Sequence, residues 1–115
     1  IAEGSSEITE EVVQEGALID LQEMVITLND RGDSPGFLRI KVNLEVVDKK
    51  VANIATQKLP KLRDVVILAL SSKSSREIRS VEGKEILKSE IFQKVQNILP
   101  AESLIGIYFS DLVIQ

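Results

Sequence analysis

Hydrophobic and polar residues alternate along residues 37–47, the pattern of a strand with one buried face and one solvated face. The apolar set is Leu38, Ile40, Val42, Leu44 and Val46, and the polar set between them is Arg39, Lys41, Asn43 and Glu45. A weaker alternation over residues 24–28 predicts a preceding strand that ends near Asn29. Residues 29–36 are dense in turn formers, so the two strands should form an antiparallel hairpin.

Two helices should follow this hairpin. Asp48 is a suitable N-cap for a helix over about 49–59. Pro60 then suits the first turn of a second helix, because proline needs no backbone partner there. Apolar residues recur at helical spacing within 61–70, which predicts that this second helix is largely buried.

The remaining helices carry recognisable start signals. Ser74 and Glu77 form a capping-box pattern for one short turn, and Ser80 can cap a last helix over about 81–99. The apolar stripe predicted for that last helix is Leu87, Ile91, Val95 and Ile98, with Lys84, Lys88 and Lys94 toward water.

A final strand is expected from Leu104 to Gln115, where Ile, Val, Tyr and Phe are frequent. The order in the chain is therefore strand, strand, helix, helix, helix, strand. An α+β fold satisfies this order most simply, with a three-stranded sheet covered by helices on one face.

The composition excludes several kinds of chemistry. The chain has 115 residues and contains neither Cys nor His, which removes disulfides, cysteine nucleophiles, histidine bases and Cys/His zinc sites. No phosphate-binding glycine loop is present. The sequence therefore predicts a protein that is not an enzyme and that uses no metal or other cofactor.

The charges are distributed unevenly along the chain. Residues 1–30 hold eight acids and no Lys or Arg, whereas residues 31–115 hold fourteen bases and ten acids. Residues 1–17 are poor in large apolar groups and are expected to form a flexible acidic tether, followed by a single domain over 18–115. The bases are scattered among acids rather than concentrated in a stripe, which argues against a nucleic-acid partner.

Several short strings together resemble one known family. They are Val42-Asn43-Leu44-Glu45-Val46, Leu59-Pro60-Lys61-Leu62-Arg63-Asp64, Leu70-Ser71-Ser72-Lys73, Gly83-Lys84-Glu85-Ile86-Leu87 and the ending Ile107-Tyr108-Phe109-Ser110-Asp111-Leu112-Val113-Ile114-Gln115. In this order they resemble blocks of FliL, the flagellar basal-body-associated family. Ser110 and Leu112 depart from it, since Thr and Phe are frequent at these positions of the family.

The resemblance implies a location, a fold and a role. It implies a periplasmic domain, held at the bacterial inner membrane by a transmembrane helix before Ile1, with a stomatin-like fold. It also implies a homo-oligomeric ring that associates with the flagellar stator proteins and supports motor torque. The absence of bases from residues 1–30 agrees, because positive residues that flank a span stay on the cytoplasmic side. The alternative is a stomatin-like membrane scaffold unrelated to flagella.

Four charged residues on predicted helix faces are candidates for contacts with a partner or a second copy: Arg63, Asp64, Arg76 and Lys84. A ring requires head-to-tail contacts, in which each copy offers two different surfaces. The alternative for Arg63 and Asp64 is a local pair at a helix end, worth less than about 1 kcal/mol.

Overall fold

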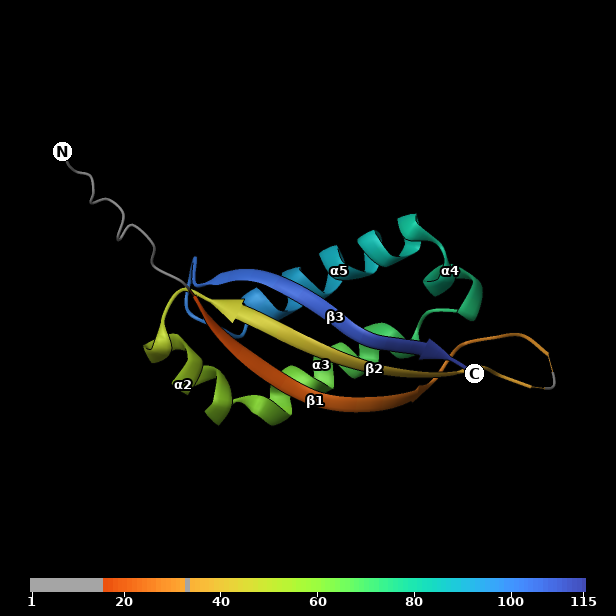
Figure 1. Ribbon diagram of the computed structural model, residues 1–115, viewed down its shortest axis with the longest axis horizontal. Helices are drawn as coiled ribbons and strands as arrows, with labels where there is room; N and C mark the ends of the chain where they lie inside the picture. Colours follow the sequence, from red (N-terminus) through yellow and green to blue (C-terminus); the bar gives the residue numbers. More distant parts are fainter. Residues whose placement is uncertain (1–15, 33) are drawn as a thin grey trace.

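This computed structural model describes residues 16–32 and 34–115 of the chain. The described part contains seven helices and strands (Figure 1). In chain order they are β1 (Ala17–Thr27), β2 (Phe37–Val46), α2 (Lys49–Gln57), α3 (Leu59–Ser71), α4 (Ser75–Arg79), α5 (Val81–Gln96) and β3 (Leu104–Ile114). This is the predicted α+β order of two strands, a helical region and a last strand.

The three strands form one antiparallel sheet in the order β1-β2-β3. The central strand is β2, which confirms both the predicted hairpin and the predicted alternation. Leu38, Ile40, Val42, Leu44 and Val46 are each completely buried. Both outer strands leave one edge unpaired within the sheet.

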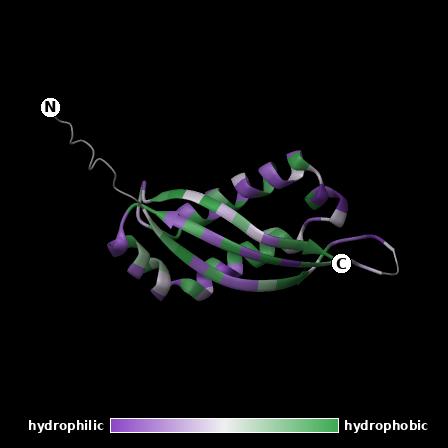
Figure 2. Cartoon of the chain, in the orientation of Figure 1, coloured by the Kyte–Doolittle hydropathy of each residue, from purple (hydrophilic) through white to green (hydrophobic). Residues whose placement is uncertain are grey.

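The helices lie behind the sheet in Figure 1, on the face where the apolar residues of β2 point. Helices α2 and α3 contact β1, and α5 contacts β3. The alternating colours of the strands in Figure 2 reflect this one-sided burial. Among the described residues the other face of the sheet has no covering layer, and Leu18 and Val25 on that face are each 67% exposed.

The predicted helix starts are confirmed. The side chain of Asp48 accepts a hydrogen bond from the backbone N–H of Val51 at 3.0 Å. Ser74 and Glu77 form the complete capping box of α4, and Ser80 caps α5 by accepting from the N–H of Gly83 at 2.9 Å. Each cap satisfies an N–H group that the helix itself cannot pair, and so fixes where the helix begins.

The end of the last helix was predicted wrongly. Helix α5 ends at Gln96 rather than near residue 99, and Ile98 is only half-buried. The N–H groups of Ile98 and Leu99 both bond to the carbonyl of Val95, so the chain tightens into a turn. As a result Leu99, at 6% exposure, takes the buried position that helical spacing had given to Ile98.

A bulge in β1 was also not predicted. The pairing register shifts between Asp20 and Glu23, where Gln22 has a φ of 72°. The carboxylate of Asp20 accepts from the N–H of Gln22 at 2.7 Å, which supports this left-handed conformation. The bulge keeps Leu21 fully buried and interrupts the regular edge of β1.

The acidic tether predicted for residues 1–17 lies outside the described residues over 1–15. Strand β1 begins at Ala17, one residue before the predicted domain start. Over the described ranges, no helix combines the length and the apolar character that crossing a membrane would require.

Candidate interaction surfaces

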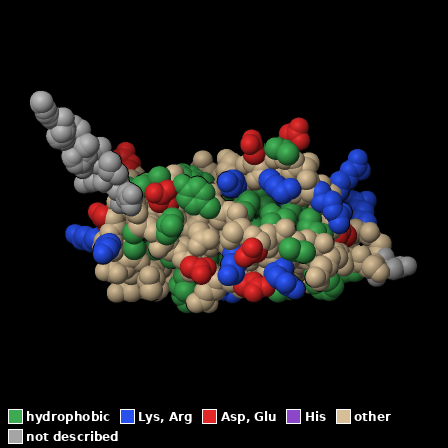
Figure 3. All heavy atoms as spheres, in the orientation of Figure 1, with side chains coloured by type: hydrophobic (Ala, Val, Ile, Leu, Met, Phe, Trp, Pro, Cys, Tyr) green, Lys and Arg blue, Asp and Glu red, His purple; other side chains and the backbone are tan. Residues whose placement is uncertain are grey.

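A groove runs between the N-terminal half of α5 and the outer edge of β3. Its apolar walls are Val81 from α5 and Phe109 and Leu112 from β3. Val81 is 69% exposed, which is high for an apolar side chain beside a core. Figure 3 shows apolar side chains gathered between these two elements, with basic side chains next to them. We call this the α5–β3 groove.

Basic side chains flank the α5–β3 groove and continue past its end. The ammonium of Lys88 lies 5.6 Å from the centre of the Phe109 ring and 5.9 Å from that of Tyr108, within cation–π range. The ammonium of Lys84 donates to the backbone carbonyl of Arg79 at 3.0 Å. Beyond it, Arg76 and Arg79 are exposed on α4. We call Lys88, Lys84, Arg79 and Arg76 the basic row.

The start of α5 adds two acids to the same region. Glu82 and Glu85 are exposed, and Glu85 lines the α5–β3 groove. Glu77, between Arg76 and Arg79 on α4, is also exposed, so four bases and three acids leave this surface with a small net positive charge at neutral pH. Its chemistry suits a ligand that is both apolar and acidic.

Arg63 lies at the other edge of the sheet and contacts the bulge of β1. Its guanidinium donates to the backbone carbonyl of Leu21 and, at 3.5 Å, to that of Gln22. Neither Leu21 nor Gln22 has a pairing partner on β2, because the register shifts between Asp20 and Glu23. Arg63 therefore secures an irregular strand edge, while its neighbour Asp64 is exposed on α3.

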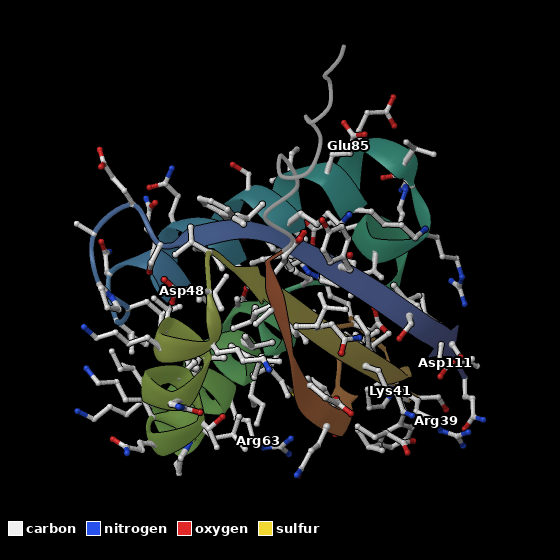
Figure 4. The ribbon with its side chains drawn as sticks, turned by 60° about the vertical axis from the view of Figure 1, so that its left-hand side comes forward. Arg39, Lys41, Asp48, Arg63, Glu85 and Asp111 are labelled. Carbon is white, nitrogen blue, oxygen red and sulfur yellow. The ribbon has the colours of Figure 1, made fainter. Side chains whose placement is uncertain are left out.

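The four candidate contact residues do not form one cluster. Arg63 and Asp64 belong to α3, which packs beneath β1, whereas Arg76 and Lys84 belong to α4 and α5. Figure 4 shows Arg63 far from Glu85, beyond the opposite edge of the sheet. The sequence pattern found the charged residues but could not show that they divide between two separate surfaces.

A group of hydrogen bonds to Asp30, which the sequence did not predict, holds α4 in place. The carboxylate of Asp30 accepts from the N–H of Ser75 at 2.7 Å, from its hydroxyl at 2.5 Å and from the N–H of Gly36 at 2.8 Å. These hydrogen bonds lower the pKa of Asp30, and the one from the Ser75 hydroxyl has the largest effect. The contact ties the loop between β1 and β2 to the helix that presents Arg76.

The open face of the sheet is mixed in character. Arg39 and Glu23 form an ion pair at 3.2 Å between neighbouring strands. Tyr108 donates to a carboxylate oxygen of Glu45 at 2.7 Å, and this hydrogen bond raises the pKa of the phenol. Pairs of this kind satisfy the charges of the face within the molecule. Among the described residues, no three acidic side chains converge as a metal-binding group.

Comparison with known proteins identifies the family. Residues 18–115 match the family described as flagellar basal body-associated protein FliL. The chain is also 39% identical over 79 residues to a protein of Aquifex aeolicus (strain VF5) named flagellar protein FliL. The match covers 69% of this chain and 49% of the relative, so the chain spans about half of that protein's length.

The domain is therefore of the basal-body-associated class. The chain belongs to the FliL family, as the resemblance of its short strings predicted. Membership supports a flagellar role.

Proposed function

We propose that this chain is a non-enzymatic structural component of the bacterial flagellar motor. It associates with the stator proteins and supports torque as a ring-forming homo-oligomer. The match of residues 18–115 to a basal-body-associated family carries the proposal. A stomatin-like scaffold unrelated to flagella is disfavoured by the same match.

Two surfaces on opposite sides of the sheet support the head-to-tail contact. The surface of Arg63 and Asp64 lies on the β1 side, and the basic row with the α5–β3 groove lies on the β3 side. A heterologous contact joins two different patches and can close into a ring. In the proposed ring, Asp64 of one copy faces Arg76 and Lys84 of the next.

The proposed location is the periplasmic side of the inner membrane, at the basal body. In this arrangement residues 1–17 link the domain to a transmembrane helix that precedes Ile1. Membrane attachment then raises the effective concentration of neighbouring domains, so that a weak contact suffices for assembly. The domain of this membrane-bound ring is also proposed to have a stomatin-like fold.

Fluorescence localisation of the tagged full-length protein in motile cells tests the proposal. We expect foci at the flagellar bases that fade in a strain without stator proteins. Foci that persist without stators would show attachment to another part of the basal body and contradict the stator contact. A uniform membrane signal in both strains would contradict the motor role.

A further inference from the structure

The α5–β3 groove presents an apolar surface beside positive charge, and the same chain contains a segment with the complementary chemistry. Residues 3–15 carry five acids and no base: Glu3, Glu7, Glu10, Glu11 and Glu15. Ile8, Val12 and Val13 lie between these acids. We propose that this acidic segment docks in the α5–β3 groove and along the basic row of its own domain.

The apolar part of the groove has room for such a segment. Val81 is 69% exposed, and Phe109 and Leu112 are only partly buried although they pack against the core. Burial of this apolar surface by an apolar segment is favourable. The small apolar residues Ile8, Val12 and Val13 are the groups of the segment that could cover it.

The basic side chains beside the groove favour an acidic ligand. Lys88 and Lys84 lie beside the groove, and Arg79 and Arg76 extend the row beyond it. Glu77, Glu82 and Glu85 oppose an acidic ligand, but four bases against three acids still give this surface a net charge of the opposite sign to the segment. Binding should therefore weaken as salt screens the exposed charges.

The chain geometry allows the segment to reach the groove of its own domain. Ala17 opposes Val46 at the start of the sheet, and Phe109 opposes Val42 four positions further along β2. Four residues of strand and two strand spacings place Phe109 roughly 17 Å from Ala17. The eleven Cα-to-Cα steps from Ser6 to Ala17 can span up to about 40 Å, which exceeds this distance.

The tether also favours the segment of the same chain over that of another copy. Covalent attachment through so few residues gives the segment an effective concentration on the order of millimolar at a site within reach. A weak contact is therefore occupied within one chain at protein concentrations too low for contact between chains. The docked segment would cover Lys84 and Arg76, and so would compete with the head-to-tail contact.

Only the competition between the docked segment and the head-to-tail contact rests on the proposed function. Docking itself concerns the single chain, so the experiment below measures docking and not assembly. Its failure would leave the motor role intact, and failure of the motor role would leave docking intact.

Disulfide trapping in the 115-residue chain tests the docking, because the chain has no cysteine of its own. The test variant is Ser6→Cys with Val81→Cys. The matched control is Ser6→Cys with Val25→Cys, since Val25 is 67% exposed and lies eight residues along β1 from Ala17, also within reach. Oxidation is followed in dilute protein by mass spectrometry and non-reducing electrophoresis.

We expect the intramolecular disulfide to form about tenfold faster in the test variant than in the control, because docking raises the local concentration of the segment at the groove. Adding Lys84→Glu and Lys88→Glu, or high salt, should remove the difference. Circular dichroism of each variant shows that its fold is kept. Equal rates in test and control would overturn the proposal. Disulfide-linked dimers in place of the intramolecular product would also overturn it, and would assign the groove to a second copy.

Discussion

At the scale of single residues, Asp30 joins parts of the chain that are distant in the sequence. Its carboxylate accepts three hydrogen bonds from Ser75 and Gly36, which connect the β1–β2 loop to α4. The ionised form is the better acceptor, which is why the pKa of Asp30 falls below 3.8. A carboxyl group with a lowered pKa in the folded state stabilises the protein only while it is ionised.

Asp30→Asn should therefore lower the urea midpoint of unfolding at neutral pH. The contribution of Asp30 is fully present above 3.8 and is lost as pH falls through its lower folded-state pKa. The difference between the variant and the parent chain should shrink in that acidic range. Asp64→Asn, which removes a carboxylate from an exposed position, is the control. A difference that stays constant with pH would contradict this role of Asp30.

Gly83 is required by a close approach between backbones at the turn from α4 to α5. A Cβ atom at this position would collide with the backbone carbonyl of Glu77. Gly83→Ala should lower the free energy of unfolding by about 1–3 kcal/mol, the usual cost of overpacking. An unobstructed helical Gly→Ala change would instead raise it by up to about 1 kcal/mol.

Thermal or urea unfolding measures this effect of Gly83→Ala. Ser89→Ala, at an exposed position of the same helix, is the matched control and should change stability little. A stabilised Gly83→Ala chain would mean that the carbonyl of Glu77 moves aside without cost.

At the scale of elements, much of the fold follows from local signals. The alternation in β2 and the caps at Asp48, Ser74 and Ser80 were predicted because each depends on residues close in sequence. The bulge at Gln22 was missed because, besides the local contact from Asp20, it is held by Arg63, which is 41 residues away. A strand pattern alone gives no indication of such a distant donor.

The candidate contact surfaces were likewise predictable only where they depend on residues close in sequence. The pattern of exposed charge indicated Arg76 and Lys84, but the α5–β3 groove beside them is formed by elements that are distant in the sequence. Phe109 and Leu112 were predicted only as members of a strand. Their place at the groove depends on β3 being an edge strand and on α5 packing beneath it.

Substitution of Arg63 distinguishes two roles for its side chain, which are stabilising the irregular edge of β1 and contacting a partner. Arg63→Met keeps most of the apolar stem but removes the hydrogen bonds to the carbonyls of Leu21 and Gln22. We expect the free energy of unfolding to fall by about 1.5–3 kcal/mol, as for other hydrogen bonds from charged groups. Lys61→Met, an exposed change on the same helix, is the control for urea unfolding. Unchanged stability together with lost self-association would make Arg63 a contact residue instead.

At the scale of the whole molecule, the β1 edge and the β3 edge of the sheet differ in the helices that pack beside them and in their charge. The β1 side presents Asp64, and the β3 side presents the basic row and an apolar groove. A domain with two unlike surfaces is suited to repeated head-to-tail contacts, whereas a two-fold dimer would use one surface twice. The family membership supports a flagellar role for the chain.

The most direct measurement of the proposed assembly is cysteine cross-linking of the full-length protein in membranes of motile cells. Asp64→Cys combined with Arg76→Cys places one thiol on each proposed surface. The account predicts a ladder of dimers, trimers and larger products from the double variant, and no ladder from either single variant, because each head-to-tail contact joins unlike surfaces. Products that stop at the dimer, or no products beyond those of the single variants, would contradict the head-to-tail ring.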